Sequence, residues 1–203
     1  MKGKTTLHHL EISLLLGVVI SLVIGTWLSG QQRALSEKVV RLHVIGASDS
    51  EEDQRVKLLA RDAVLELAEP WLKEASSREE AMAILTRHLP ELAQAGAQAA
   101  GMNATAQVET AAWFPTKEYT DFALPAGRYP ALKITLGDGK GRNWWCVVYP
   151  SLCTSPVVET AARTGGFSQD QINLITGENN GYVVKFKALE IWNQFTEWVS
   201  RGQ

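Results

Sequence analysis

Histidine and cysteine, which often carry catalysis or hold metals, are scarce in this chain. Four histidines and two cysteines occur among 203 residues, and only His43 and His88 lie beyond the N-terminal region. The zinc-site spacings HExxH and CxxC are absent. The nucleophile patterns GxSxG and SxxK are also absent, and Asp49-Ser50 lacks the glycine of an aspartic-protease triplet. The sequence therefore predicts no metal site, no catalytic residue and no cofactor.

Lysine and arginine do not gather into a basic tract, and the formal net charge of the chain is −2. Nucleic acid is therefore not an expected partner. The glycine-rich segment Gly137–Gly141 lacks the Lys-Ser/Thr ending of a phosphate-binding loop. It predicts a turn, and no small-molecule substrate is evident.

One long hydrophobic run is present, near the N-terminus. Ile12–Gly30 contains no charged residue, and as a helix it would span roughly 28 Å, close to the thickness of a bilayer's hydrocarbon core. Lys2 and Lys4 precede it, so the positive-inside rule keeps this end in the cytoplasm and exports the rest. We expect residues 1–30 to be a transmembrane anchor or a signal peptide, and the length of the apolar core favours the anchor.

Residues 38–203 are predicted to form one extracytoplasmic domain after a polar linker at 31–37. An alternating strand at 38–45 precedes helices that begin at the capping residues Ser50 and Ser77. Most of the remaining pattern is β, which predicts an α+β fold with a mainly antiparallel sheet and helices packed on one face. The other predicted elements are a helix at Glu91–Ala100, strands at Ala104–Phe114, Tyr119–Leu124, Tyr129–Leu136, Asn143–Tyr149 and Tyr182–Lys187, and a helix at Ala188–Ser200.

Three segments carry more specific expectations. The helix that starts at Ser50 should end or bend at Pro70, because proline has no backbone N–H to donate. Gly137–Gly141 should join the strands on either side of it as a hairpin. Thr154–Asn180 is polar and weakly periodic, and is expected to be a long surface loop.

Cys146 and Cys153 are the only cysteines. An even pair in an exported chain is typical of a disulfide. Closing so short a stretch stabilises a fold by about 2–3 kcal/mol in the chain-entropy description. A catalytic thiol would need a histidine and a third group beside it in space, so we favour the disulfide.

His43, Asp49 and Asp53 have the residue types of an acid–base or metal site. A structural role explains them better. His43 lies on the polar face of a strand, and the two aspartates suit a turn and the start of a helix.

Trp144 and Trp145 are adjacent, so in a strand they face opposite sides of the sheet. One can join the core. The other needs a second covering layer, or is exposed as an anchor for a partner, and the sequence leaves both possibilities open.

Four stretches, in this order, resemble the stage II sporulation protein R family. RLHVIGASDSEEDQ (Arg41–Gln54) is the most specific to that family. FPTKEY (Phe114–Tyr119), LPAGRYPALKI (Leu124–Ile134) and NWWCVVYPSLC (Asn143–Cys153) support it, and Tyr182–Trp192 fits more loosely.

The resemblance implies an intercellular signal of endospore-forming bacteria and no enzymatic activity. Members of the family are made in the forespore and exported into the space between the two membranes. There they activate a membrane-bound aspartic protease, which matures the precursor of an early mother-cell sigma factor. The implied location is the cell membrane, with the C-terminal domain outside the cytoplasm, or the intermembrane space after secretion. One departure is Gly46-Ala47, where the family more usually has Ala-Asn; it affects the geometry of the turn.

We expect the exported domain to dock on the protease through the polar turn Ala47–Asp53 and whichever of the two adjacent tryptophans is exposed. The alternative is an exported or membrane-anchored cell-envelope hydrolase with His43, Asp49 and Asp53 as its acid–base set. A third reading is a structural domain of the envelope without a switching role. The candidate contact residues are His43, Ser48, Asp49, Ser50, Asp53, Trp144 and Trp145.

Overall fold

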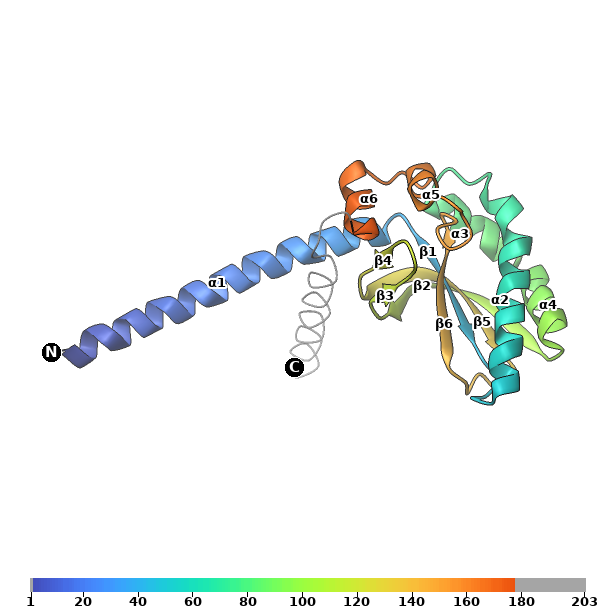
Figure 1. Ribbon diagram of the computed structural model, residues 1–203, viewed down its shortest axis with the longest axis horizontal. Helices are drawn as coiled ribbons and strands as arrows, with labels where there is room; N and C mark the ends of the chain where they lie inside the picture. The colour runs from blue at the N-terminus through green and yellow to red at the C-terminus, as the bar shows by residue number, and fades with distance from the viewer. Residues whose placement is uncertain (1, 178–203) are drawn as a thin grey trace.

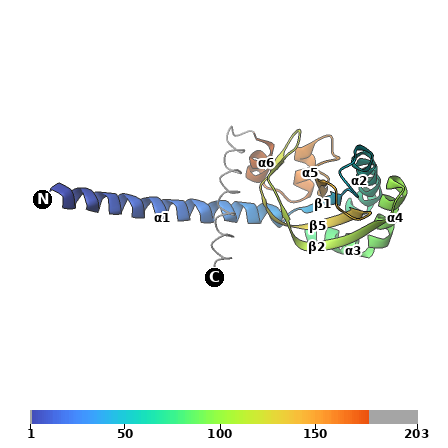
Figure 2. The ribbon, with the colours of Figure 1, turned by 90° about the horizontal axis from the view of Figure 1, so that it is seen from below.

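The computed structural model describes residues 2–177 of the chain. A four-stranded sheet carries helices on both of its faces, and a long helix projects from one end (Figure 1, Figure 2). The strand predicted at Tyr182–Lys187 and the helix predicted at Ala188–Ser200, with Trp192 and Trp198, lie outside the described residues.

The N-terminal helix α1 covers Lys2–Ser36. Its first part extends away from the domain (Figure 2), and its last turn packs on the sheet through Leu35, which is fully buried. Residues 31–36, expected as a polar linker, continue this helix instead, because Leu35 belongs to a core. Within residues 2–177, no helix has the combination of length and apolar character that crossing a membrane requires. The membrane span predicted at residues 12–30 stays a prediction.

The sheet consists of β1 (Val40–Ile45), β2 (Ala104–Phe114), β5 (Gly127–Leu136) and β6 (Asn143–Tyr149). Its strand order is β2-β5-β1-β6. β1 pairs with β5 in parallel and with β6 antiparallel, and β2 pairs antiparallel with β5. The sheet is therefore mainly antiparallel, as predicted. Where one strand was expected at 119–124, two short strands, β3 (Lys117–Glu118) and β4 (Ala123–Leu124), pair with each other.

The hairpin predicted around Gly137–Gly141 does not form, because β1 lies between β5 and β6. The loop crosses the end of β1 and bonds to the turn that follows this strand. Lys140 donates its backbone N–H to the carbonyl oxygen of Ala47 at 3.1 Å, and Gly141 donates to Gly46 at 2.8 Å. Four of the six side chains of β1 are buried, which suits a central strand covered on both faces.

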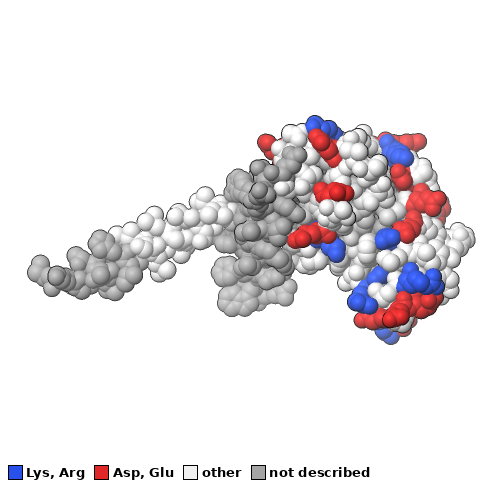
Figure 3. Space-filling model, viewed as in Figure 1, with Lys and Arg blue, Asp and Glu red and all other residues white. Residues whose placement is uncertain are grey.

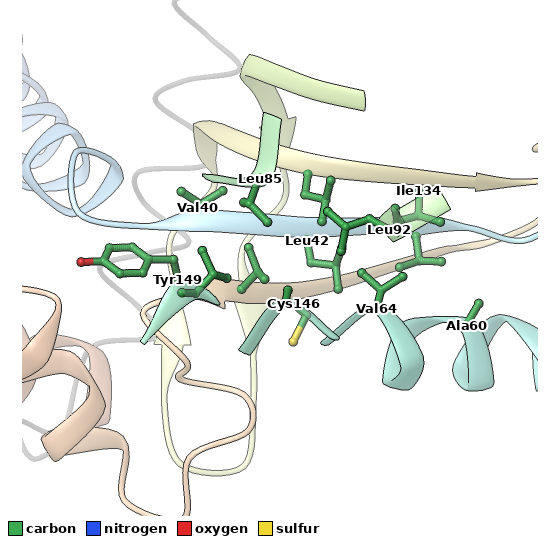
Figure 4. Packing of buried hydrophobic residues seen from close by; sticks show 14 of the residues in the cluster. Val40, Leu42, Ala60, Val64, Leu85, Leu92, Ile134, Cys146 and Tyr149 are labelled. Atoms are coloured by element: carbon green, nitrogen blue, oxygen red, sulfur yellow. The ribbon is translucent and has the colours of Figure 1, made fainter. Parts of the chain in front are cut away.

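Three helices cover one face of the sheet: α2 (Glu51–Leu72), α3 (Arg78–Arg87) and α4 (Leu89–Ala100). Ser50 and Ser77 cap the first two, as predicted, and each accepts a hydrogen bond from the backbone N–H three residues later. Side chains from these helices meet alternate residues of the sheet in the larger core (Figure 4). Its members include Val40, Leu42, Ala60, Val64, Leu85, Leu92, Ile134, Cys146 and Tyr149.

Helix α2 runs through Pro70 to Leu72, so the end predicted at the proline is wrong, while the bend given as the alternative stays a prediction. Pro70 is exposed, whereas Ala68 and Leu72 are buried in the larger core. Packing of the last turn therefore outweighs the hydrogen bond that proline cannot donate.

The opposite face of the sheet is covered at one end only. The helices α5 (Val158–Thr164) and α6 (Gln169–Thr176) pack there with the β3–β4 pair, while Thr105 and Gln107 at the other end are exposed. The surface loop expected at Thr154–Asn180 is therefore wrong for residues 154–177, and the expectation that helices pack on one face only is also wrong. The sequence does contain a start signal for α6, the capping box at Ser168. The helix was missed because it is short and carries few apolar residues.

Candidate functional site

The polar turn at residues 47–53 connects β1 to α2 and bonds largely to itself. The hydroxyl of Ser48 donates to the carboxylate of Asp53, and the backbone N–H of Asp53 donates to Ser50 Oγ at 3.1 Å. The backbone N–H of Ser50 donates to Ser48 Oγ at 3.2 Å. Three of the candidate contact residues therefore build the start of α2.

Asp49 ties this turn to the loop before β6. Its Oδ1 accepts a hydrogen bond from the backbone N–H of Arg142 at 2.7 Å. The carbonyl oxygen of Arg142 accepts from Lys57 Nζ at 2.9 Å, and Lys57 also donates to Gln54 Oε1. Lys57 is only 4% exposed, and burial lowers its pKa. The turn, α2 and the loop are thus held as one unit.

His43 lies near the same end of the sheet, on the face opposite α2. Its ring stacks on Trp145 with the centroids 3.9 Å apart, and its Nε2 lies 3.0 Å from Asn143 Oδ1. Burial lowers the pKa of His43, and the hydrogen bond with Asn143 only partly opposes this effect. The neutral imidazole is therefore the form that the folded protein favours.

His43, Asp49 and Asp53 do not form an acid–base set. In the part of the chain that the structure describes, no hydrogen bond or ion pair joins His43 to either carboxylate, and each side chain has another partner. Nor does any group of three or more His, Cys, Asp or Glu side chains among residues 2–177 have an arrangement that could hold a metal ion. No observation favours the hydrolase alternative.

Trp144 and Trp145 face opposite sides of the sheet, and both are partly covered. Trp144 packs against the larger core, and the guanidinium carbon of Arg61 lies 4.6 Å from its ring centroid. Trp145 stacks on His43 and contacts Phe114, whose ring centroid is 4.8 Å away. Trp145 is the stronger contact candidate, because it lies on the incompletely covered face.

Arg41 is a notable residue that the sequence did not single out. Its side chain is fully buried, and its guanidinium carbon lies 4.2 Å and 5.1 Å from the ring centroids of Phe114 and Tyr129. Its Nη2 donates to the hydroxyl of Tyr119 at 3.0 Å, whereas Nε and Nη1 have no hydrogen-bond partner among the described residues. The sequence signal that could have drawn attention to this cluster is that all of its members lie within the stretches that resemble the family. These members are Arg41, Phe114, Tyr119 and Tyr129.

Cys146 lies within β6, Cys153 lies in the segment that follows this strand, and both are free thiols. The hydrogen bond between the two thiols lowers the pKa of Cys146, and the positive charges of Arg61 and Arg41 act in the same direction. The same hydrogen bond, together with burial, raises the pKa of Cys153. The disulfide between these cysteines stays a prediction.

A cavity of about 500 Å³ borders both cysteines. Its wall also includes Arg61 and Trp144 on one side and Tyr119 on the other. The indole Nε1 of Trp144 is buried and has no hydrogen-bond partner within the described residues. The two thiols are therefore the reactive groups of a polar and aromatic cavity at the edge of the sheet.

Comparison with known proteins identifies relatives of this chain. The family model described as stage II sporulation protein R matches residues 36–159. The protein named "Stage II sporulation protein R" from Bacillus subtilis (strain 168) is 39% identical over 127 residues, which make up 61% of this chain and 57% of that protein. The match thus spans little more than half of that relative. No solved structure matches.

The matched residues contain the whole four-stranded sheet, the polar turn, both adjacent tryptophans and both cysteines. The family model covers more than half of the chain. The protein therefore belongs to the stage II sporulation protein R family.

Proposed function

We propose that this protein is an exported sporulation signal that activates a membrane-bound aspartic protease across the space between forespore and mother cell. Activation of the protease triggers the maturation of a mother-cell sigma factor precursor. Membership of the stage II sporulation protein R family, over a match that includes the sheet and the polar turn, is the observation that carries this proposal.

The hydrogen bonds of the turn support a binding role. Ser48, Asp49 and Asp53 are committed to partners inside the protein, so their chemistry fixes a shape. A protein that activates another by docking needs a surface that is already rigid before binding, because ordering a flexible loop on association costs affinity.

We place the C-terminal domain outside the cytoplasm, held at the membrane by α1 or released after cleavage. Lys2 and Lys4 precede the apolar part of α1, as the positive-inside rule requires for a cytoplasmic N-terminus. Leu14 and Val23 of this helix are 72% and 63% exposed, and insertion into lipid would remove such side chains from water.

The proposed docking site, which we call the end surface, consists of the turn Ala47–Asp53 with His43, Arg142, Asn143 and Trp145. These residues come from the end of β1, the start of α2 and the start of β6. Figure 3 shows charges of both signs gathered at the end of the domain where α2 begins. An aromatic residue next to a charged, solvent-exposed rim is typical of protein interfaces.

Co-purification of the full chain with the protease from detergent-solubilised membranes tests this surface. Arg142→Glu and Glu51→Lys reverse charges on exposed side chains of the end surface. Glu66→Lys makes the same change farther along α2, also at an exposed position, and serves as the matched control. Trp145→Ala removes the aromatic contact, and Trp113→Ala, at a residue that is 38% exposed on β2, is its control.

We expect the end-surface variants to bind the protease about fivefold to 150-fold more weakly and to recover less of it, because interfacial charge reversal and loss of a central aromatic each cost roughly 1–3 kcal/mol. The two controls should bind like the unchanged protein. Circular dichroism confirms that each variant is folded. Normal binding by folded Arg142→Glu and Trp145→Ala together would show that the partner docks elsewhere.

A further inference from the structure

Strand β6 forms one edge of the sheet, and side chains cover part of that edge. The backbone N–H of Val147 donates to Cys153 Sγ at 3.2 Å. The carbonyl oxygen of Trp145 accepts from the hydroxyl of Tyr119 at 3.2 Å. An uncovered edge pairs readily with other chains, so a thiol and a phenol placed on these two groups protect the strand.

The segment that carries Cys153 is held at this edge by non-covalent packing against both cores. It leaves β6 at Pro150 and turns back, and the backbone N–H of Leu152 donates to the Pro150 carbonyl at 2.7 Å. Leu152 is buried in the smaller core, whereas Thr154 and Pro156 beyond it are exposed. The position of Cys153 Sγ over β6 therefore depends on the short turn and on the packing of Leu152 and of Cys153 itself.

The surroundings of Cys146 favour its thiolate, whereas burial disfavours the thiolate of Cys153. Arg41 is buried with two N–H groups unpartnered among the described residues, and its only side-chain hydrogen bond there goes to Tyr119. Its charge, with that of Arg61, acts on Cys146. A buried cation without a carboxylate partner stabilises a nearby thiolate, the reactive form of cysteine.

We propose that Cys146 and Cys153 are oxidised to an intramolecular disulfide that ties the 150–156 segment to the edge of β6. The backbone N–H of Val147, the residue next to Cys146, donates to Cys153 Sγ at 3.2 Å, and both cysteines border one cavity, so no large movement of the backbone is needed. The cross-link adds a covalent bond to a cover that packing and the Val147 N–H hydrogen bond already hold in place. This proposal does not depend on the protease being the partner of the protein.

The oxidation proceeds by thiol–disulfide exchange with a disulfide oxidant. The Cys146 thiolate attacks one sulfur of the oxidant, whose S–S bond breaks, and a mixed disulfide forms as one thiolate leaves. The Cys153 thiolate then attacks the Cys146 sulfur and expels the second thiolate. The two cysteine protons pass to the two departing thiolates. The protein loses two electrons and two protons, and the oxidant is reduced to two thiols.

The test uses the full chain, purified in detergent under reducing conditions and then incubated with glutathione disulfide. Free thiols are counted by maleimide labelling after denaturation, and peptides are mapped by mass spectrometry without reduction. We expect both labels to be lost and a peptide pair linked through Cys146 and Cys153 to appear. Two labels per chain, glutathione adducts as the end product, or disulfide-linked dimers would each overturn the proposal.

The variant Cys153→Ser is the matched control. It retains one thiol, so each chain must end with either a maleimide or a glutathione on Cys146. Loss of both from this variant would mean that the labels of the unchanged protein disappear by another oxidation, which also overturns the proposal. Reduction should lower the thermal unfolding midpoint of the unchanged protein and leave that of the variant the same. If reduction leaves the unfolding midpoint of both proteins unchanged, a stabilising cross-link between the 150–156 segment and β6 is refuted.

Discussion

Lys57 and Arg142 are joined by a hydrogen bond of 2.9 Å between the lysine Nζ and the arginine carbonyl oxygen. The backbone N–H of the same arginine donates to Asp49. A buried lysine of α2 and a carboxylate of the turn thus hold one loop residue from both sides. This arrangement explains how the stretch Arg41–Gln54 can be specific to a family without contributing a catalytic group, because it sets the shape of the end surface.

Replacing Asp49 should separate this structural role from docking. Asp49→Ala removes the acceptor of the Arg142 N–H, and we expect the free energy of unfolding to fall by about 1 kcal/mol, as for a typical hydrogen bond. Glu51→Gln, at a neighbouring exposed position, should change it by less than ~0.5 kcal/mol. Urea denaturation measures both. Equal effects of the two variants would contradict a specific role for the Asp49–Arg142 bond.

His43 should make stability depend on pH. Burial lowers its pKa in the folded protein, and Lys133 and Arg41 act in the same direction, while Asn143 and Glu109 oppose them. The unfolded chain has a histidine pKa of about 6.5. Below that value the unfolded state binds more protons, so this part of the stability is complete above about pH 6.5 and is lost as pH falls towards the lowered pKa.

Urea denaturation of the unchanged protein and of His43→Gln, at about pH 7.5 and about pH 5, checks the sign of this dependence. The unchanged protein should lose more stability than the variant on acidification, because the variant has no imidazole to protonate at this position. The two proteins contain the same carboxylates, so the comparison isolates the contribution of the imidazole. The same loss in both would show that burial does not disfavour the charged form of His43.

Local patterns predicted most of the elements, though not α5 and α6, and did not predict how the strands pair. The alternation of Val40, Leu42 and Val44 identified the buried side of β1, and capping serines marked the starts of α2 and α3. The loop Gly137–Gly141 was correctly read as a turn. Which strand lies beside it depends on β1, almost a hundred residues earlier in the chain, and no short-range pattern contains that information.

The candidate site was predicted in part. Asp49 and Asp53 have the structural roles expected of them, whereas the environment of Arg41 could not be derived. Alternation assigns Arg41 to the polar side of β1, and only the tertiary fold brings Phe114 and Tyr129 around it. The aromatic rings that enclose this buried cation come from distant parts of the chain. The sequence therefore shows that such residues are present but not that they meet.

The reactivity of Cys146 should depend on Arg61. Arg61→Gln removes a positive charge that lowers the pKa of the Cys146 thiol, so the pKa should rise and less thiolate should be present near neutral pH. Alkylation by iodoacetamide should then be several-fold slower. Lys117→Gln is the control, since Lys117 borders the same cavity but is not among the main charges that act on Cys146. Equal rates in all three proteins would contradict this electrostatic effect.

The larger core should be sensitive to truncation where a leucine is fully buried. Leu85 on α3 is 0% exposed, and Leu85→Ala should lower the free energy of unfolding by about 2–5 kcal/mol. Leu59 on α2 is 45% exposed, and Leu59→Ala should cost less than about 1 kcal/mol. Thermal unfolding monitored by circular dichroism compares the two. A similar loss in both would contradict the packing of α3 on the sheet.

The activation of the protease is tested most directly by the size of the sigma factor precursor in a host that does not sporulate. The host expresses the precursor and the membrane protease, with or without the full chain described here. We predict that the precursor is shortened only when all three proteins are present, and that Arg142→Glu weakens this effect while Glu66→Lys does not. An uncut precursor, in cells where this protein is exported and folded, would contradict the proposed function.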